Sequence, residues 1–215
     1  MLTIYGSDLS GPANKVRFVA NVTGISYEYR RINLREKEQK QEWFLKINPL
    51  GKVPAMDDGG FCLFESGAIC KYLCNKAGSN LYPQDLKQRA IVDQWIDFSS
   101  LHIGINVSKV VYNRLFAPRT GAPVSQESIN DGLNFLSQYL PYIEKQLTDH
   151  QFLAGAQMTL ADVTLLASLD PCELSGIDLG KYAKLCAWRN SLKAQDFYTQ
   201  CHKEYGESLK QTAGK

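Results

Sequence analysis

The sequence predicts two domains of different classes: an α/β domain with a mixed four-stranded sheet, followed by an all-α helical domain. Three observations support this division. Strand-like and helix-like patterns alternate as far as residue 76, a turn-rich stretch follows, and every strong pattern beyond it has helical periodicity. We therefore expect the α/β domain at 1–78, a linker at 79–85 and the helical domain at 86–208.

The first domain is expected to follow the order β-α-β-α-β-β-α. In chain order the predicted elements are a strand at 2–5, a helix at 12–22, a strand at 26–32, a short helix ending before Asn48, hairpin strands at 52–56 and 61–64, and a helix at 65–76. This order implies a mixed sheet with helices on both faces. It is the thioredoxin-like arrangement.

The second domain begins with an unusually long predicted helix, from Leu86 to Phe116, with a possible kink at Gly104 and a stop at Ala117-Pro118. Another helix is expected at 125–147, with Pro141 as a local disturbance. A capping box with Asp in place of Glu, Thr159-Leu-Ala-Asp162, precedes the most apolar helix, at 160–169. Two further helices are expected near 182–194 and 196–205.

Composition and charge exclude several classes of protein. The net charge of +2 over 215 residues predicts no strong attraction to nucleic acid or to an anionic membrane. No apolar run is long enough to span a bilayer, and no signal sequence is visible at the N-terminus. The six cysteines are scattered, and Cys70 and Cys74 share an apolar helix face, so buried thiols are favoured over metal ligands. We expect a cytoplasmic protein without a metal.

Two motifs together predict a peptide-binding site. Val53-Pro54 opens a strand, and an X-Pro bond there is a candidate cis peptide that leaves the backbone polar groups of Val53 free for a peptide-like ligand. Glu65-Ser66 leads directly into an apolar helix, whose first N–H groups can hold a carboxylate. The pair suits a small peptide with a free carboxylate, such as glutathione.

Ser10-Gly-Pro-Ala13 lies between the first strand and the first helix, where a thioredoxin-like fold has its redox Cys-Gly-Pro-Cys. Ser and Ala in the cysteine positions exclude dithiol–disulfide exchange at this turn. The Ser10 hydroxyl can still donate a hydrogen bond to a ligand thiolate, assisted by the helix dipole. The alternative is that Ser10 serves only as an N-cap.

The whole chain, from residue 2 to about 205, resembles the cytosolic glutathione transferases. The motifs that carry the resemblance are the Ser10 turn, Asn48-Pro-Leu-Gly-Lys-Val-Pro54, Phe64-Glu-Ser-Gly-Ala-Ile69, the Arg89–Trp95 opening of the long helix, and Phe152-Leu-Ala-Gly with Thr159-Leu-Ala-Asp162. The serine at position 10 makes the chain similar to the theta, delta and phi groups of these enzymes, which use serine in this turn. Tyr5 on the first strand is the rival hydroxyl, and we favour Ser10.

The resemblance implies a role for each residue of the glutathione site. Glu65 would pair with the γ-glutamyl ammonium and Ser66 would bind its carboxylate, while the main chain of Val53, held by Pro54, would pair with the cysteinyl unit. Lys52 would reach the glycyl carboxylate. Related enzymes commonly have a histidine where this chain has Gln39, so Lys40 or Lys52 would replace that contact. The alternative for Lys52 is a solvated charge at the end of a strand. The alternative for Glu65-Ser66 is a pair that serves only to begin a helix.

The second substrate is expected to be a hydrophobic electrophile in an apolar pocket. The residues implied for this pocket are Leu9, Leu101, His102, Ile105, Lys109 and Tyr112. The alternative for His102 is a packed core histidine, and Tyr112 either assists a leaving group or packs in the core.

We therefore predict a cytoplasmic, homodimeric glutathione transferase of detoxification, with glutathione as co-substrate and peroxide reduction as a second reaction open to the same thiolate. Two alternatives stay open: a non-catalytic binding and dimerisation module with this fold, and a glutathione-dependent isomerase. The sequence does not identify the electrophile.

Overall fold

The computed structural model describes residues 1–207 and 209 of the chain, and they divide into two compact units. One unit is Met1–Tyr82 together with the segment that begins at Gln195, and the other is Pro83–Ala194. The sequence analysis assigned everything from 86 to 208 to the helical domain, and residue 208 lies outside the described residues. The structure differs from residue 195 onward, because that segment packs on the first helix of the N-terminal unit.

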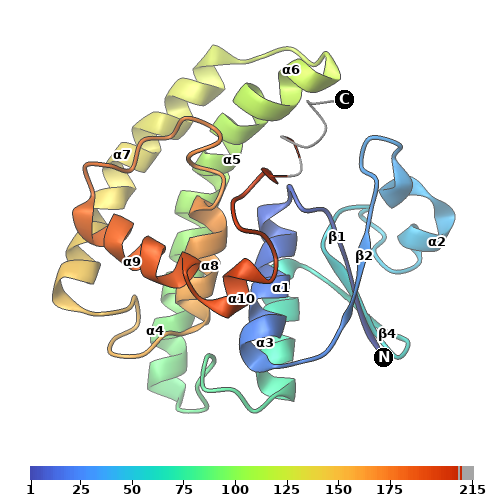
Figure 1. Cartoon of the computed structure of the whole chain (residues 1–215), viewed down its shortest axis with the longest axis horizontal. Coiled ribbons are helices and arrows are strands. Elements are labelled where there is room, and N and C mark those ends of the chain that lie inside the picture. The colour runs from blue at the N-terminus through green and yellow to red at the C-terminus, as the bar shows by residue number, and fades with distance from the viewer. Residues whose placement is uncertain (208, 210–215) are drawn as a thin grey trace. The chain divides into compact units, whose positions relative to one another are not determined.

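The first unit is built on a four-stranded sheet in the order β2-β1-β3-β4 (Figure 1). β1 (Leu2–Gly6) is parallel to β2 (Glu28–Arg31) and antiparallel to β3 (Ala55–Asp58), which forms a hairpin with β4 (Phe61–Phe64). The helices of this unit are α1 (Gly11–Thr23), the one-turn η1 (Glu38–Lys40), α2 (Glu42–Leu45), α3 (Ser66–Lys76) and α10 (Asp196–Thr199). The predicted mixed sheet is confirmed.

Alternation along the strands buries both faces of the sheet. Ile4 pairs with Met56, and the next pair is Tyr5 with Ala55, so the two pairs point to opposite faces. Tyr5 and Ala55 form a buried cluster with Ile32 and with Phe44 of α2. α1 and α3 pack against each other and both contact the sheet. The sheet therefore has a helix-covered core on each side.

The second unit begins with a long helix that is not interrupted at Ala117-Pro118, contrary to the prediction. It runs through α4 (Leu86–Asp97), the π-helical η2 (Phe98–Gly104), α5 (Ile105–Val111), the π-helical η3 (Tyr112–Phe116) and α6 (Ala117–Thr120). Pro118 is accommodated at the start of α6, and Gly121, at φ 71°, ends the helix. The predicted kink at Gly104 corresponds to the end of the first π-helical stretch.

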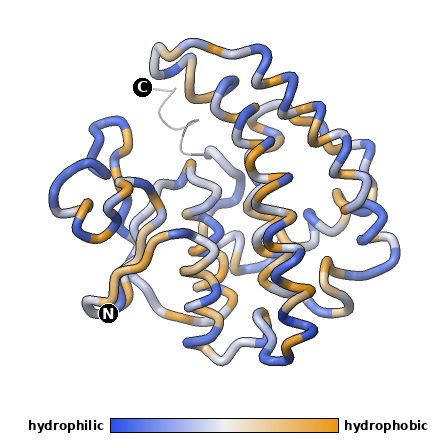
Figure 2. Tube along the Cα trace, turned by 180° about the vertical axis from the view of Figure 1, so that it is seen from behind, coloured by the Kyte–Doolittle hydropathy of each residue, from blue (hydrophilic) through white to orange (hydrophobic). Residues whose placement is uncertain are grey.

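α7 (Gln126–Asp149) and α9 (Ala183–Lys193) pack against each other, and α8 (Leu160–Leu169) is buried except at Ser168. Pro141 lies inside α7 without ending it. Hydrophobic and hydrophilic residues alternate along the helices of this unit in Figure 2, as expected for helices with one buried face.

The last predicted helix, α10 in the first unit, is shorter than expected, because it ends at Thr199 instead of reaching residue 205.

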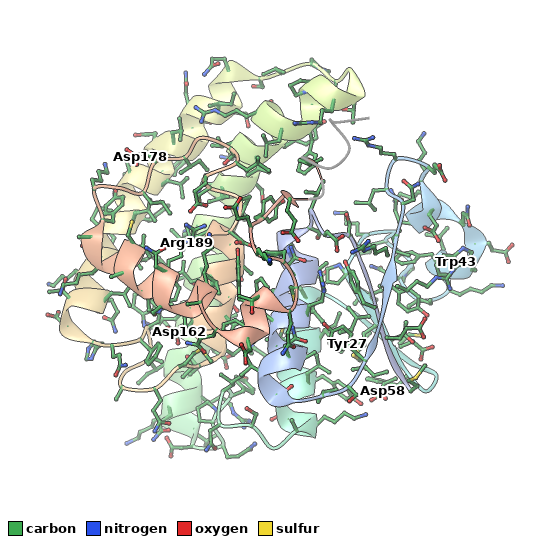
Figure 3. The ribbon with its side chains drawn as sticks, in the orientation of Figure 1. Tyr27, Trp43, Asp58, Asp162, Asp178 and Arg189 are labelled. Carbon is green, nitrogen blue, oxygen red and sulfur yellow. The ribbon has the colours of Figure 1, made fainter. Side chains whose placement is uncertain are left out.

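The predicted capping box at the start of α8 is confirmed. Asp162, labelled in Figure 3, accepts hydrogen bonds from the Thr159 N–H at 2.8 Å and the Thr159 hydroxyl at 3.0 Å. Its other oxygen accepts from the Leu153 N–H and from the indole N–H of Trp188. Burial raises the pKa of Asp162, and these hydrogen bonds oppose that effect. The carboxylate therefore joins three segments of the helical unit.

Across residues 1–207 and 209, no helix combines the length and the apolar character needed to cross a membrane.

Candidate active site

The strand register brings one end of β1, β3 and β4 together. Tyr5, near the carboxyl end of β1, pairs with Ala55 at the start of β3, and Ala55 pairs with Phe64 at the end of β4. On the other side, Gly6 pairs with Arg31, the last residue of the parallel strand β2. The carboxyl ends of three strands and the amino end of the fourth therefore meet at one edge.

The predicted glutathione residues follow or precede the strands at this edge. They are Ser10 after β1, Gln39 and Lys40 after β2, Lys52, Val53 and Pro54 before β3, and Glu65 and Ser66 after β4. Sequence spacing alone did not fix this arrangement. It follows from the antiparallel placement of β3 between β1 and β4.

Ser10 is the N-cap of α1, as one of the two sequence interpretations holds. Its backbone is extended (φ −99°, ψ 105°), and its Oγ accepts a hydrogen bond of 3.3 Å from the N–H of Ala13. A hydroxyl that accepts one hydrogen bond keeps its own proton for donation. The capping role and donation to a ligand thiolate are therefore compatible, and the side chain is half-buried.

The turn before Ser10 is held by a polar network that sequence reasoning missed. Asp8 pairs with Arg17 of α1 at 3.2 Å and with Arg31 at 3.1 Å, and its carbonyl accepts from the side chain of Asn14 at 2.9 Å. Asn14 and Arg17 are buried although they are polar. The available signal in the sequence was two polar residues, Asn14 and Arg17, spaced so that they share one face of a short helix. Such residues need hydrogen-bond partners when the helix face is buried.

The segment before β3 is also fixed by a buried side chain. The peptide bond Val53-Pro54 is cis, as predicted, and the ladder begins only at Ala55. The Asn48 side chain, 2% exposed, donates to the Lys52 carbonyl at 2.6 Å and accepts from the Leu50 N–H at 3.0 Å. Asn48 thereby holds the loop that presents Val53 outside the ladder.

Glu65 has an unusual backbone conformation at the start of α3. Its φ is +70°, one of two positive values outside glycine among the described residues, and it is the N-cap of an eleven-residue helix. Such a conformation costs about 1 to 3 kcal/mol and is concentrated at functional sites. The Glu65 side chain is exposed and Ser66 is half-buried.

A buried lysine lies near this helix start. Lys15 of α1 is only 7% exposed, and burial lowers its pKa, while Cys70 and Glu65 oppose that shift. Burial also raises the pKa of the Cys70 and Cys74 thiols to about 12, so the prediction of buried thiols is confirmed. Nothing in the sequence pattern indicates that Lys15 is buried, because an amphipathic helix usually exposes its lysines.

The segment with Gln39 and Lys40 lies against the turn at Leu50-Gly51. Lys40 Nζ donates to the Leu50 carbonyl at 3.0 Å, and a Cβ on Gly51 would come within 2.7 Å of the Gln39 carbonyl oxygen. The Gln39 Oε1 is buried and has no hydrogen-bond partner among the described residues. Lys40 and Lys52 are both exposed.

The rival hydroxyl, that of Tyr5, belongs to a packed ring. The ring lies 6.0 Å from that of Trp43 (labelled in Figure 3) and 6.1 Å from that of Phe44, and the residue is 7% exposed. Burial, with Asp57 as a further cause, raises the pKa of Tyr5. Ser10 at a helix start is the better donor to an anion.

The residues predicted for the second substrate divide between two groups. Leu9 belongs to the first unit, in the turn before Ser10. In the helical unit, Leu101, Ile105 and Tyr112 are exposed by 57%, 49% and 50%, whereas His102 packs between the rings of Phe98 and Tyr139 and Lys109 lies over the ring of Phe135. His102 contacts two rings, but His102 and Tyr112 are both exposed, so neither packs in the core as the alternative interpretation predicted. Among the described residues no group of His, Cys, Asp and Glu could hold a metal ion.

The first unit is thus a thioredoxin-like domain of the class that binds a thiol-containing peptide and does not exchange disulfides. Its redox-cysteine position holds serine, its cis-proline precedes β3, and a helix start at the same sheet edge is open to a carboxylate.

The comparisons with known proteins agree with this class. The chain matches the glutathione S-transferase N-terminal domain over residues 2–75 and the glutathione S-transferase C-terminal domain over residues 114–196. It is 33% identical to glutathione S-transferase F12 of Arabidopsis thaliana over 172 residues, and this match covers 79% of this chain and 80% of that protein. The chain belongs to the glutathione S-transferase family, and the resemblance seen in its sequence is confirmed.

Two solved structures extend the comparison to the whole fold. A delta-class glutathione transferase of Nilaparvata lugens has a TM-score of 0.87 and 29% identity, covering 98% of this chain and 97% of that one. Maize glutathione S-transferase I, solved in complex with an atrazine glutathione conjugate, has a TM-score of 0.85 and 28% identity, covering 93% and 95%. The predicted fold class, a thioredoxin-like domain followed by a helical domain, is confirmed.

Proposed function

We propose that this protein activates the thiol of glutathione through Ser10 and transfers the resulting thiolate to a hydrophobic electrophile. The observation that carries the proposal is the position of Ser10, an N-cap whose hydroxyl proton remains available at the sheet edge shared with Val53 and Glu65. The transferase class itself follows from the family.

The glutathione residues have distinct proposed roles. Glu65 pairs with the γ-glutamyl ammonium, Ser66 and the first N–H groups of α3 hold the neighbouring carboxylate, and the main chain of Val53 pairs with the cysteinyl unit. The strained backbone of Glu65 and the position of Val53 outside the ladder support these roles. Lys52 and Lys40 attract the glycyl carboxylate.

The energetics of thiolate formation are within reach of this turn. A free thiol has a pKa of about 8.5, and lowering it by about two units requires about 2.7 kcal/mol of preferential thiolate binding. A hydrogen bond to a charged group contributes about 1.5 to 3 kcal/mol, and a helix start about 0.3 to 1 kcal/mol. In the transfer step a carbon–sulfur bond forms, and the leaving group departs with the electron pair of the bond that breaks. The enzyme itself forms no covalent bond.

The exposed apolar row on the long helix supports a hydrophobic second substrate. Leu101, Ile105 and Tyr112 present their side chains to solvent from one helix, and we assign these three residues to electrophile binding. The maize relative was solved with a conjugate of glutathione and atrazine, and this supports conjugation as the reaction proposed for this chain. We do not assign His102 and Lys109 to the electrophile site, because both pack against aromatic rings of α7.

Those rings support the proposal of a homodimer. Trp95, Phe98 and His102 of the long helix and Phe135 and Tyr139 of α7 form one row of contacting rings, and Phe135 is 37% exposed. A contiguous aromatic face of this kind is typical of a protein–protein interface. We propose that the partner is a second copy of the chain. We also propose that the dimer acts in the cytosol and that its role is detoxification. A monomeric mass in sedimentation at micromolar concentration would contradict the dimer.

The first experiment is ultraviolet difference absorbance of the protein with glutathione from about pH 5 to about pH 9, which follows the thiolate of the bound peptide. We expect the thiolate to titrate about two pH units below the free thiol. In Ser10→Ala, glutathione should still bind but conjugation should fall about a hundredfold. Unchanged turnover in this variant would remove Ser10 from the mechanism.

An absence of bound thiolate at neutral pH in the unaltered protein would instead favour a non-catalytic binding module with this fold. That outcome would redirect the search from substrates to partner proteins.

A further inference from the structure

The chain after α9 returns to the first unit and runs along α1 (Figure 1). We call residues 195–207 the C-terminal clamp. The clamp buries aromatic side chains against Phe18 of α1, whose ring lies 6.0 Å from that of Phe197, 5.1 Å from that of Tyr198 and 5.7 Å from that of His202. Phe18 and Tyr198 have no exposed surface, so the clamp is part of the core of this unit.

Two polar side chains of α1 fix the backbone of the clamp. Asn21 donates to the Phe197 carbonyl at 2.9 Å, and Arg17 donates to the Cys201 carbonyl at 3.3 Å. Arg17 also pairs with Asp8, in the turn that leads to Ser10. The same guanidinium therefore contacts both the clamp and the catalytic turn.

The clamp reaches the turn directly at its far end. The Tyr205 hydroxyl donates a hydrogen bond of 2.5 Å to the Leu9 carbonyl, across a sequence separation of 196 residues. Tyr205 is 7% exposed, and its ring packs at 6.3 Å from that of His202. The Leu9 carbonyl belongs to the peptide that joins Leu9 to Ser10, so this hydrogen bond constrains the plane from which the Ser10 side chain departs.

We propose that Tyr205 is a positioning residue for glutathione activation: it holds the Leu9–Ser10 peptide so that the Ser10 hydroxyl points at the bound thiolate. This inference rests on the proposed role of Ser10. A hydroxyl contributes to thiolate stabilisation only when its donor geometry is correct, and a misplacement of about 1 Å is costly in catalysis. The Ser10 N–H donates to the Ser7 carbonyl, and the Ser10 carbonyl accepts from the Asn14 N–H. The Tyr205 contact adds a constraint on the Leu9 carbonyl, the group on the other side of the Leu9–Ser10 peptide bond.

Tyr205→Phe tests the proposal, because it removes one oxygen and leaves the ring packed against His202. We expect the ionisation of bound glutathione to shift upward by about half a pH unit to one unit. The kcat for chlorodinitrobenzene conjugation at about pH 6.5 should fall about twofold to fivefold, while the KM for glutathione changes by less than about twofold. A residue with only a structural role would lower the unfolding midpoint without moving the thiolate titration.

Tyr72→Phe is the matched control. Tyr72 also donates its hydroxyl to an acceptor within this unit, Asp58 at 2.6 Å, but at the β3–β4 hairpin. The Tyr72→Phe variant should lose a similar amount of stability, and its bound thiolate should titrate as in the unaltered protein.

The outcomes separate this inference from the proposed function. A thiolate signal absent from the unaltered protein would contradict the proposed function. A thiolate that is present, lost in Ser10→Ala and unmoved in Tyr205→Phe would overturn only the role of Tyr205. A shift in Tyr205→Phe that is matched in Tyr72→Phe would also overturn it, because the effect would then belong to stability and not to the turn.

Discussion

The two ends of the proposed glutathione site differ in how firmly the protein holds them. At the γ-glutamyl end, Glu65 keeps a positive φ of 70°, and Lys15 is buried nearby. At the glycyl end, Lys40 and Lys52 are exposed, and Lys40 already donates to the Leu50 carbonyl. At the first end the fold fixes the backbone of Glu65 and buries Lys15, whereas the second end relies on exposed lysines.

This difference indicates where the binding energy resides. Preorganised groups lose little freedom when the ligand binds, whereas a long exposed side chain must be ordered at that moment. The γ-glutamyl end should therefore dominate affinity. The glycyl end, where Gln39 stands in the place of a common histidine, should contribute weakly. Variants at the two ends test this ranking.

The largest effect is expected for Glu65→Gly. Loss of a charged hydrogen-bonding partner should weaken glutathione binding about tenfold to a hundredfold, as measured by isothermal titration calorimetry. Glu65→Ala should weaken binding to the same extent, because it loses the same carboxylate.

The two variants should differ in stability. Alanine keeps a Cβ at a positive φ and glycine does not, so Glu65→Gly should be more stable than Glu65→Ala by about 1 kcal/mol in urea unfolding. Equal stabilities would mean that the backbone at residue 65 is not strained, and the contrast between the two ends would lose one of its supports.

Lys15→Met should separate binding from stability at the same end. Burial lowers the pKa of Lys15, so the folded protein holds this proton less readily than the unfolded chain does. The charge therefore costs stability at neutral pH, and the cost falls as the pH rises through the lowered pKa toward the ordinary value for lysine.

We expect Lys15→Met to be more stable than the unaltered protein at pH 7 by about 1 kcal/mol, with a smaller difference near about pH 10. Glutathione should bind about fivefold more weakly, because the proposed γ-glutamyl end loses the cation that interacts with Glu65. Lys46→Met is the control, because Lys46 is a lysine of the same unit whose side chain is exposed. A loss of stability in Lys15→Met that is the same at both pH values would contradict this account of Lys15.

The sequence predicted the local geometry at Ser10, Val53 and Glu65 better than the contacts that support these residues. Glu65, Val53 and Ser10 were identified because short motifs with proline, serine and helix starts report local geometry. Local patterns cannot report that Lys15 is buried between helices. They also cannot report that Tyr205 meets Leu9 across 196 positions, since that contact depends on how the chain returns after α9.

The helical unit shows the same limit. The capping box at Thr159 and Asp162 was predicted from four residues, whereas the end of the long helix was misjudged at Ala117-Pro118. Proline is compatible with the first turn of a helix, and a π-helical stretch before it supplies a junction at which that turn can begin. Gly121, with its positive φ, was the more reliable stop signal.

The smallest effect is expected for Lys52→Gln at the glycyl end. Lys52 is exposed, so its attraction for the glycyl carboxylate is screened by water and salt, and binding should weaken only about twofold at about 0.15 M salt. The difference should disappear at about 1 M salt, where the Debye length is about 3 Å. Calorimetric titration of both proteins at the two salt concentrations measures this. A loss of tenfold or more that persists at high salt would show that Lys52 is as fixed as Glu65, and the proposed asymmetry between the two ends would be wrong.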